Sequence, residues 1–140
     1  MKILKNLATI AVAALLFSSC GDSNPSPTLK DPNFEVVNCP KVKNPITDLS
    51  WLAQIVKNTS EYHNKYGQKG EMTKFFSGTY KGTTIYLIEY YYSKTSPIGD
   101  GNAYGCDGMN IAYLYGCFGN GNYLPLKANT SNMMLIYEIK

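Results

Sequence analysis

A chain of 140 residues is long enough for one folded domain with short flanking segments. Its 13 basic residues, all lysines, stand against 10 acidic residues, and the formal net charge is +3. This weak charge excludes the basic footprint of a nucleic-acid-binding protein. Without arginine, the chain also lacks the side chain best suited to bidentate binding of phosphate or carboxylate groups.

The amino terminus has the three-part layout of a secretory leader. Two lysines precede an apolar stretch over residues 7–17, and two serines then lead to Cys20. The apolar stretch is shorter than the roughly 20 residues of a membrane-spanning helix. The segment LFSSC resembles the lipobox of bacterial lipoproteins, in which the cysteine is lipidated and becomes the first mature residue. The alternative is an ordinary secreted leader with an incidental cysteine.

We therefore expect a signal peptide over residues 1–19 and lipidation of Cys20. Residues 20–35 contain three prolines and no apolar periodicity, which indicates a flexible tether. The folded domain is expected over residues 36–140. The protein would then lie in the cell envelope, on the periplasmic side or at the outer-membrane surface, with the membrane as a partner through its lipid anchor.

An amphipathic helix is predicted to open the domain. Thr47 or Asp48 can cap its start, and apolar residues follow at helical spacing. The spacing continues to Tyr66, where Gly67 is suited to ending the helix. Trp51 is interpreted as a core anchor between this helix and a sheet.

Two strands joined by a tight turn are predicted at the centre of that sheet. Residues 72–80 and 83–92 are rich in threonine, isoleucine and tyrosine, and Gly82 suits the positive φ of a two-residue turn. Neither face of the second strand is polar, so we expect it to be central, with the helix over one face. Alternation assigns its side chains to two faces, with Ile85, Leu87 and Tyr91 on one and Tyr86, Ile88, Tyr90 and Tyr92 on the other.

The rest of the chain predicts a loop over residues 93–102, strands over 103–106 and 109–115, an irregular connection over 116–127 and a last strand over 132–139. In the last strand, alternation places four side chains on one face: Met133, Leu135, Tyr137 and Ile139. The predicted fold class is α+β, with one N-terminal helix packed on an antiparallel sheet of about four to five strands.

Three cysteines lie beyond the leader, at Cys39, Cys106 and Cys117. An exported protein can form disulfides, and three cysteines permit one bond at a time. All three pairings stay open.

Several motifs resemble a family of small uncharacterised lipoproteins from Bacteroidota. They are the helix start NPITDLSWLAQIV, the strand pair around KGTTIYLIEY, the turn CDG and the terminal strand LIYEI. The similarity covers Asn44 to Lys140, and its motifs are structural rather than catalytic. No activity is assigned to that family, so the resemblance implies the fold and the location without a function.

Motifs for catalysis and cation binding are scarce. Asp100 could begin a calcium loop, but Tyr104 and Ile111 occupy positions that require ligands. His63 is the only histidine, which excludes sites built from several histidines, and no nucleophile motif accompanies it. We therefore expect no metal, no cofactor and no enzymatic activity.

Glu89 leaves one enzymatic alternative open. It lies inside the central strand, where apolar surroundings favour acid chemistry, and with a second acid it would make a small carbohydrate-active hydrolase. The competing interpretation is that Glu89 faces solvent or pairs with a neighbouring lysine, such as Lys74 across the hairpin.

Twelve tyrosines are the remaining functional signal. Tyr86, Tyr90 and Tyr92 share one face of the central strand, and Tyr113 and Tyr115 can join them. An exposed platform of such rings would stack on a sugar or pack on a protein, whereas a half-buried face would only cover apolar surface. The sequence thus predicts a non-enzymatic binding or accessory module whose partner is a glycan or an envelope protein, not a nucleic acid.

Overall fold

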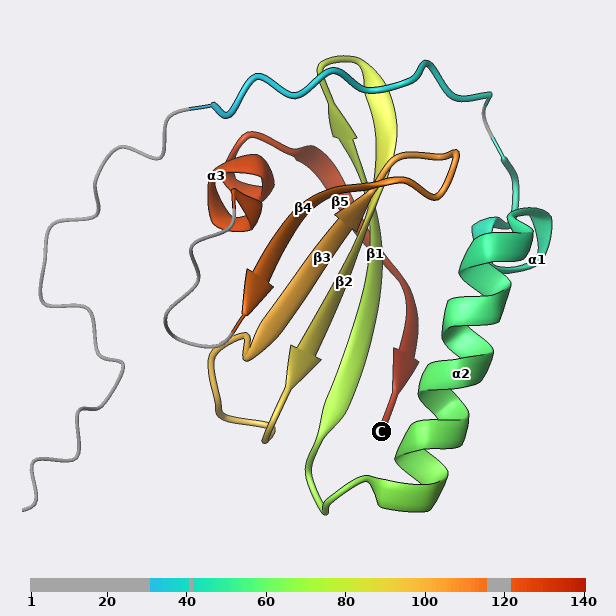
Figure 1. Ribbon diagram of the computed structural model, residues 1–140, viewed down its shortest axis with the longest axis vertical. Helices are drawn as coiled ribbons and strands as arrows, with labels where there is room; N and C mark the ends of the chain where they lie inside the picture. The colour runs from blue at the N-terminus through green and yellow to red at the C-terminus, as the bar shows by residue number, and fades with distance from the viewer. Residues whose placement is uncertain (1–30, 41, 116–121) are drawn as a thin grey trace, which may run out of the picture.

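The computed structural model describes residues 31–40, 42–115 and 122–140 (Figure 1). Within these ranges, five strands form one antiparallel sheet in the order β4-β3-β2-β1-β5. This arrangement confirms the predicted α+β fold class. The elements in chain order are α1 (Pro45–Asp48), α2 (Ser50–Tyr66), β1 (Met72–Tyr80), β2 (Thr83–Tyr91), β3 (Asp100–Tyr104), β4 (Asn110–Tyr115), α3 (Tyr123–Ala128) and β5 (Ser131–Ile139).

The predicted helix is present as two consecutive helices that meet at Leu49, whose backbone is extended with φ of −107° and ψ of 101°. Pro45 fits the first turn of α1 because an amide hydrogen there would have no partner within the helix. The predicted cap is wrong, since Asp48 lies at the end of α1 and its carboxylate reaches back to accept from the Asn44 N–H at 2.9 Å. The second helix ends at Tyr66, as predicted.

The central hairpin confirms the two predicted strands and their turn. Tyr80 pairs with Thr83, and the register continues to Met72 opposite Tyr91. The turn residues Lys81 and Gly82 both have positive φ, at 49° and 79°. Two positive φ values define the primed turn whose twist matches that of the strands. Because β2 ends at Tyr91, Tyr92 lies just beyond the strand.

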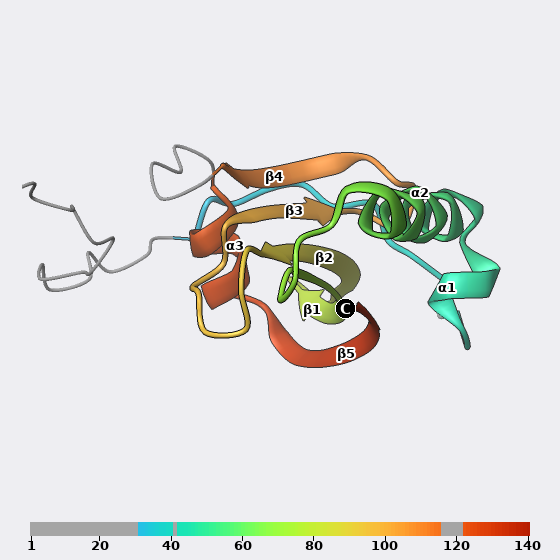
Figure 2. The ribbon, with the colours of Figure 1, turned by 90° about the horizontal axis from the view of Figure 1, so that it is seen from below.

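Helices cover both faces of the sheet, with α2 on one side and α3 on the other (Figure 2). The core beneath α2 contains Leu52, Val56, Phe75, Tyr86 and Ile88. The opposite core contains Ile85, Leu87, Ala103, Leu114, Tyr123 and Leu126. The central strand is therefore apolar on both sides because each side has its own helix.

Helix α3 was not predicted, because residues 116–127 read as an irregular connection. Pro125 is compatible with this helix since it lies in the first turn, where an amide hydrogen needs no intrahelical partner. Tyr123 and Leu126 lie three residues apart and are both buried. A helix of six residues is too short to show a periodic pattern in the sequence.

The second hairpin is shifted from its predicted position. Strand β3 begins at Asp100, inside the segment predicted to be a loop, because Asp100 and Asn102 pair with both neighbouring strands. The turn then spans Gly105 to Met109, where the Gly105 N–H donates to the Met109 carbonyl oxygen at 2.9 Å. Neighbouring strands on both sides outweigh the turn preference of glycine, asparagine and aspartate.

The last strand, β5, lies at the edge of the sheet and is irregular. Its register against β1 shifts between Phe75 and Phe76, where Tyr137 pairs with the first and Leu135 with the second. Adjacent residues of β1 face opposite sides, so Leu135 and Tyr137 do too. The predicted common face for Met133, Leu135, Tyr137 and Ile139 is therefore wrong, because a bulge inserts an extra residue.

The segment before α1 runs in extended form along one end of the sheet (Figure 1). Packing against the domain begins before the predicted boundary at residue 36. Phe34 contacts the core, and its N–H donates to the Tyr80 hydroxyl at 3.1 Å. Cys39 forms a disulfide with Cys106, with 5.7 Å between the Cα atoms. This bond joins the segment to the β3–β4 turn. Cys117 lies outside the described residues.

Candidate binding groove and the buried Glu89 cluster

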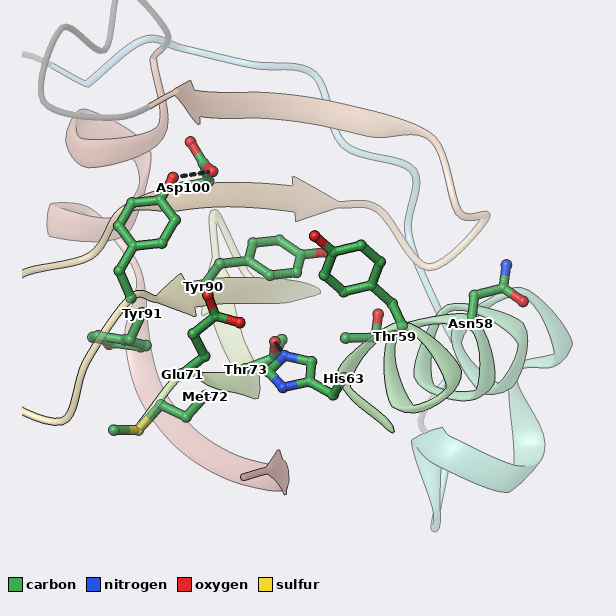
Figure 3. Close-up of a pocket in the computed structure, with 11 residues that line it drawn as sticks. Asn58, Thr59, His63, Glu71, Met72, Thr73, Tyr90, Tyr91 and Asp100 are labelled. Atoms are coloured by element: carbon green, nitrogen blue, oxygen red, sulfur yellow. Dashed lines mark hydrogen bonds between the residues drawn. The ribbon is translucent and has the colours of Figure 1, made fainter. Parts of the chain in front are cut away.

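A groove of about 350 Å³ lies between the carboxyl-terminal half of α2 and one end of the sheet (Figure 3). Small-molecule sites typically measure about 300–1,000 Å³, so a single small ligand fits this volume. The helix contributes Asn58, Thr59, Tyr62 and His63. The strands and their flanking residues contribute Glu71, Met72, Thr73, Tyr90, Tyr91, Tyr92 and Asp100.

The helical wall of the groove continues the stripe that anchors α2 to the sheet. Leu52 and Val56 are buried in the core, and Thr59 and His63 follow at the same helical spacing. The His63 Nε2 lies 3.0 Å from the hydroxyl of the buried Thr73. The stripe thus changes from apolar to polar where the helix passes the end of the sheet, and this change creates a polar wall.

The sheet side of the groove is built from tyrosines. Tyr90 is half-buried, and burial raises the pKa of its hydroxyl, while a hydrogen bond with Thr59 lowers that pKa. Tyr92 is 58% exposed, and its hydroxyl donates to the Asp100 Oδ2 at 2.7 Å. The Tyr92 ring lies over Gly99, where a Cβ atom would have no room. Gly99 thus allows the close approach that positions the ring.

The titratable lining residues of the groove give it negative charge. Glu71 and Asp100 are its carboxylates, and none of the described lining residues is a lysine. The pKa of Tyr92 is raised, first by its hydrogen bond to Asp100, then by burial and then by the negative charges of Asp100 and Glu71. Lys74 contacts the Tyr91 ring at 5.0 Å, but its ammonium is paired with Glu138 at 4.0 Å.

Two further tyrosines extend this surface across the sheet. Asp100 pairs with Tyr90 on one side and with Tyr115 on the other, so the three side chains point to one face. Tyr113 lies two residues before Tyr115 and on the same face, and the two ring centroids are 5.1 Å apart. Their exposed fractions are 45% and 65%. We define the tyrosine surface as Tyr62, Tyr90, Tyr92, Tyr113 and Tyr115.

The predicted platform of Tyr86, Tyr90 and Tyr92 is corrected by this arrangement. Tyr86 is only 2% exposed, because α2 covers it and the Trp51 ring packs edge-on against it at 5.7 Å. Tyr90 and Tyr92 lie farther along the chain, where they line the groove opposite the polar residues of α2. Trp51 itself has the predicted anchoring place, since its Nε1 donates to the Cys106 carbonyl oxygen at 2.9 Å.

Glu89 lies on the opposite face and is fully buried, at 0% exposure. Its Oε2 accepts from the Tyr91 hydroxyl at 2.5 Å, and its Oε1 accepts from the Tyr123 hydroxyl at 2.7 Å. The Lys127 ammonium forms an ion pair with the same Oε1. Glu89 therefore does not face solvent, and it pairs with a lysine from α3, Lys127, rather than with Lys74 across the hairpin.

The Glu89 cluster, defined as Glu89, Tyr91, Tyr123 and Lys127, has the properties of a structural latch. Burial raises the pKa of both tyrosines, and the contact with the Glu89 carboxylate raises them further. Both carboxylate oxygens already accept hydrogen bonds. A catalytic acid must reach a substrate oxygen, and a fully enclosed carboxylate does not. The cluster instead fastens α3 to β2.

The sequence pattern does not bring together the lining residues Asn58, Thr59, Glu71 and Asp100, which come from separate parts of the chain. One signal was available, namely the change from apolar to polar residues along the helical stripe after Val56. Among the described residues, no three histidine, cysteine, aspartate or glutamate side chains gather in a way that could hold a metal ion. The predicted lipidation site, Cys20, lies outside the described ranges.

Comparisons with known protein families, with curated proteins and with solved structures give no match to this chain. Within residues 31–40, 42–115 and 122–140, no helix has the length and apolar character needed to cross a membrane.

Proposed function

We propose that the chain is a lipid-anchored, non-enzymatic binding module of the cell envelope, and that its ligand is a glycan. The observation that carries this proposal is the tyrosine surface, which continues a groove lined with hydrogen-bonding side chains. This combination matches the two kinds of surface that a sugar presents.

The apolar faces of a sugar ring require flat apolar partners, and exposed tyrosine rings supply them while their hydroxyls stay in water. Tyr90 and Tyr115 lie two strand spacings apart, or about 10 Å. The surface is therefore long enough to contact successive units of a short oligosaccharide. Tyr113 adds a second exposed ring beside Tyr115.

The hydroxyl groups of a sugar require acceptors and donors at fixed places. Glu71 and Asp100 offer carboxylate oxygens, and Asn58 offers an amide that both donates and accepts. These groups come from three separate parts of the chain, namely α2, the residue before β1 and the start of β3, so a ligand could contact them from more than one side. Hydrogen bonds to charged acceptors are the stronger class, which supports selective binding.

The location rests on the sequence of residues 1–35. Its leader, its LFSSC motif and its proline-rich tether support a lipid anchor at Cys20. Buried acyl chains contribute about 0.8 kcal/mol per CH₂, so several chains give stable attachment. We expect Cys20→Ala to move the protein from the membrane fraction to the soluble fraction. Unchanged fractionation, with no acyl mass on the amino-terminal peptide, would contradict the anchor.

The glycan proposal is tested with the purified whole chain on a glycan array, followed by calorimetry with the strongest ligand. We expect Tyr115→Ala to weaken binding by roughly fivefold to tenfold, as loss of one aromatic contact of about 1 kcal/mol predicts. Tyr137→Ala is the matched control, because Tyr137 is an exposed tyrosine on β5, outside both the groove and the tyrosine surface. Equal weakening by both variants, or an array without any binding, would contradict the proposal.

A further inference from the structure

We infer, on the basis of the proposed glycan binding, that the ligand is an extended β-linked chain that lies across the strands, with successive sugar units over β2, β3 and β4. The class of glycan and its direction on the sheet depend on that proposed function. The groove beside α2 holds one end of the chain, and an exposed pair of rings on β4 holds the units that follow.

A row of aligned residues crosses these three strands, which are neighbours in the sheet (Figure 1). Tyr90 of β2 pairs with Asp100 of β3, and Asp100 pairs in turn with Tyr115 of β4. The side chains of directly paired residues point to the same face of a sheet. The row therefore connects the groove, which Tyr90 and Asp100 line, to the exposed ring of Tyr115 on the same face.

The spacing of this row matches the repeat of an extended glycan. Neighbouring strands lie about 4.8 Å apart, which is close to the length of about 5 Å that one sugar unit has in an extended chain. One unit can therefore lie over each strand, and three successive units reach from Tyr90 to Tyr115. A chain with α-1,4 links coils, so its units would leave the sheet after the first contact. The spacing thus favours chains with β-1,4 links.

The rings on β4 suit the flat faces of such a chain. Tyr113 and Tyr115 are both exposed, and their ring centroids are 5.1 Å apart. The hydroxyl groups of a β-1,4-linked glucose chain are equatorial, so each sugar ring presents axial C–H bonds on its two faces. Exposed tyrosine rings pack against apolar faces of this kind while their hydroxyls stay in water. We define Tyr113 and Tyr115 as the edge subsite.

A hydrogen-bond donor lies between the groove and the edge subsite. Asn102 of β3 pairs with Tyr113, and its Oδ1 accepts from the Asn110 Nδ2 at 2.9 Å. Within the described part of the chain, the NH₂ group of Asn102 has no hydrogen-bond partner and is not enclosed. This group can therefore donate to a hydroxyl of the unit that lies over β3. The faces of the chain thus meet rings where its edge meets a donor.

The test is calorimetry of the purified whole chain with cello-oligosaccharides of two to five glucose units. Malto-oligosaccharides of the same lengths are the matched ligands, because they differ only in the configuration of the link. We expect cellobiose to bind weakly and the affinity to rise about tenfold once the oligosaccharide is long enough to reach Tyr115. The malto series should show no such rise.

Two variants of one residue identify the contact that causes the rise. Tyr115→Ala should abolish the rise and leave the affinity for cellobiose unchanged. Tyr115→Phe should keep it, because the ring and not the hydroxyl makes the contact. Tyr137→Ala is the matched control, since Tyr137 is an exposed tyrosine on β5, outside the groove and the edge subsite.

The outcomes separate this inference from the proposed function. Equal affinity for two and five cello units, or an equal rise in the malto series, would overturn the extended chain while glycan binding stands. A rise that Tyr115→Ala leaves intact, or that Tyr137→Ala reduces as much, would overturn the edge subsite. Binding of other array glycans but of neither series would overturn the β-linked class alone. Binding of neither series, together with a blank glycan array, would remove the proposed function and this inference with it.

Discussion

Tyrosines lie beside carboxylates on both faces of the sheet, and the two groups have opposite surroundings. In the Glu89 cluster, Tyr91 and Tyr123 enclose a carboxylate that is fully buried and paired with Lys127. In the groove, Tyr92 contacts the carboxylate of Asp100 while its ring stays 58% exposed. Similar residues therefore build a latch on one face and an open site on the other.

The difference comes from where each helix ends. Helix α3 places Tyr123 and Leu126 directly over β2 and β3 and brings its own lysine to the carboxylate. Helix α2 covers Tyr86 but leaves the far end of the sheet open, where its buried stripe becomes polar at Thr59. Exposure, and not residue type, thus separates the carboxylate of the Glu89 cluster from the carboxylates of the candidate groove.

The largest effect is expected from Glu89→Gln, which tests the latch. The NH₂ group of the new glutamine is a donor, and it would face other donors at a place where a carboxylate oxygen accepts. The charge of Lys127 would also lose its partner. We expect the free energy of unfolding to fall by about 3 kcal/mol, as for other broken buried pairs. Guanidinium denaturation measures this loss. The control is Glu138→Gln, since the partly exposed Glu138–Lys74 pair should contribute less than about 1 kcal/mol.

If Glu89→Gln changes stability no more than the control does, the Glu89 cluster is not a latch, and the contrast between the two faces fails.

The next effect concerns alkaline pH and Tyr123. The folded protein raises the pKa of Tyr91 and Tyr123 above that of an unfolded tyrosine, so their stabilising contribution is complete below about pH 10 and is lost as pH rises further. We expect stability to fall steeply above pH 10, and Tyr123→Phe to flatten that fall while costing about 1 kcal/mol at neutral pH. Denaturation at several pH values, read beside tyrosinate absorbance, checks both. If the stability of Tyr123→Phe falls as steeply above pH 10 as that of the unchanged protein, ionisation of the buried Tyr123 hydroxyl does not cause the fall.

A smaller effect is expected from Gly99→Ala, which tests the open groove. The added methyl group would meet the Tyr92 ring and displace it from Asp100. We expect ligand affinity to fall severalfold while the free energy of unfolding changes by about 1 kcal/mol or less. Gly70→Ala is an informative comparison, because Gly70 has open space around it and a φ of 99°, so its effect would be backbone strain alone. Full affinity in Gly99→Ala would show that the Tyr92 position is not needed for binding.

The smallest effect on stability is expected from Glu71→Gln. Glu71 is a half-exposed residue of the groove, so its loss should change the free energy of unfolding by no more than about 0.5 kcal/mol. Thermal denaturation beside Glu89→Gln compares the two carboxylates directly. A loss as large as that of Glu89→Gln would place both carboxylates in the same structural class.

Much of the fold could be predicted because its signals are local. The hairpin of β1 and β2 follows from residue types in two short runs and from the positive φ of Lys81 and Gly82 at the turn. Helix α3 could not be predicted, because its stability comes from Tyr123 and Leu126 packing on a sheet that is formed by distant residues. The bulges in β5 have no sequence signal that alternation can detect.

The candidate site was less predictable because its residues come from separate parts of the chain. Tyr90 and Tyr92 were identified from alternation, but the cover over Tyr86 depends on the path of α2 across the sheet. The partner of Glu89 lies 38 residues away in sequence, on a helix that was not predicted. Pairings at such separation arise from topology, which a single sequence does not specify.

The disulfide between Cys39 and Cys106 has a mechanical consequence for the anchored protein that we propose. A pull on the tether reaches the domain through the segment before α1, which contacts Tyr80 and is then bonded covalently to the β3–β4 turn. Tension therefore passes into the sheet before it reaches α1 or α2. Because α1 follows Cys39 in the chain, a pull on the tether would load the disulfide before it could unwind α1.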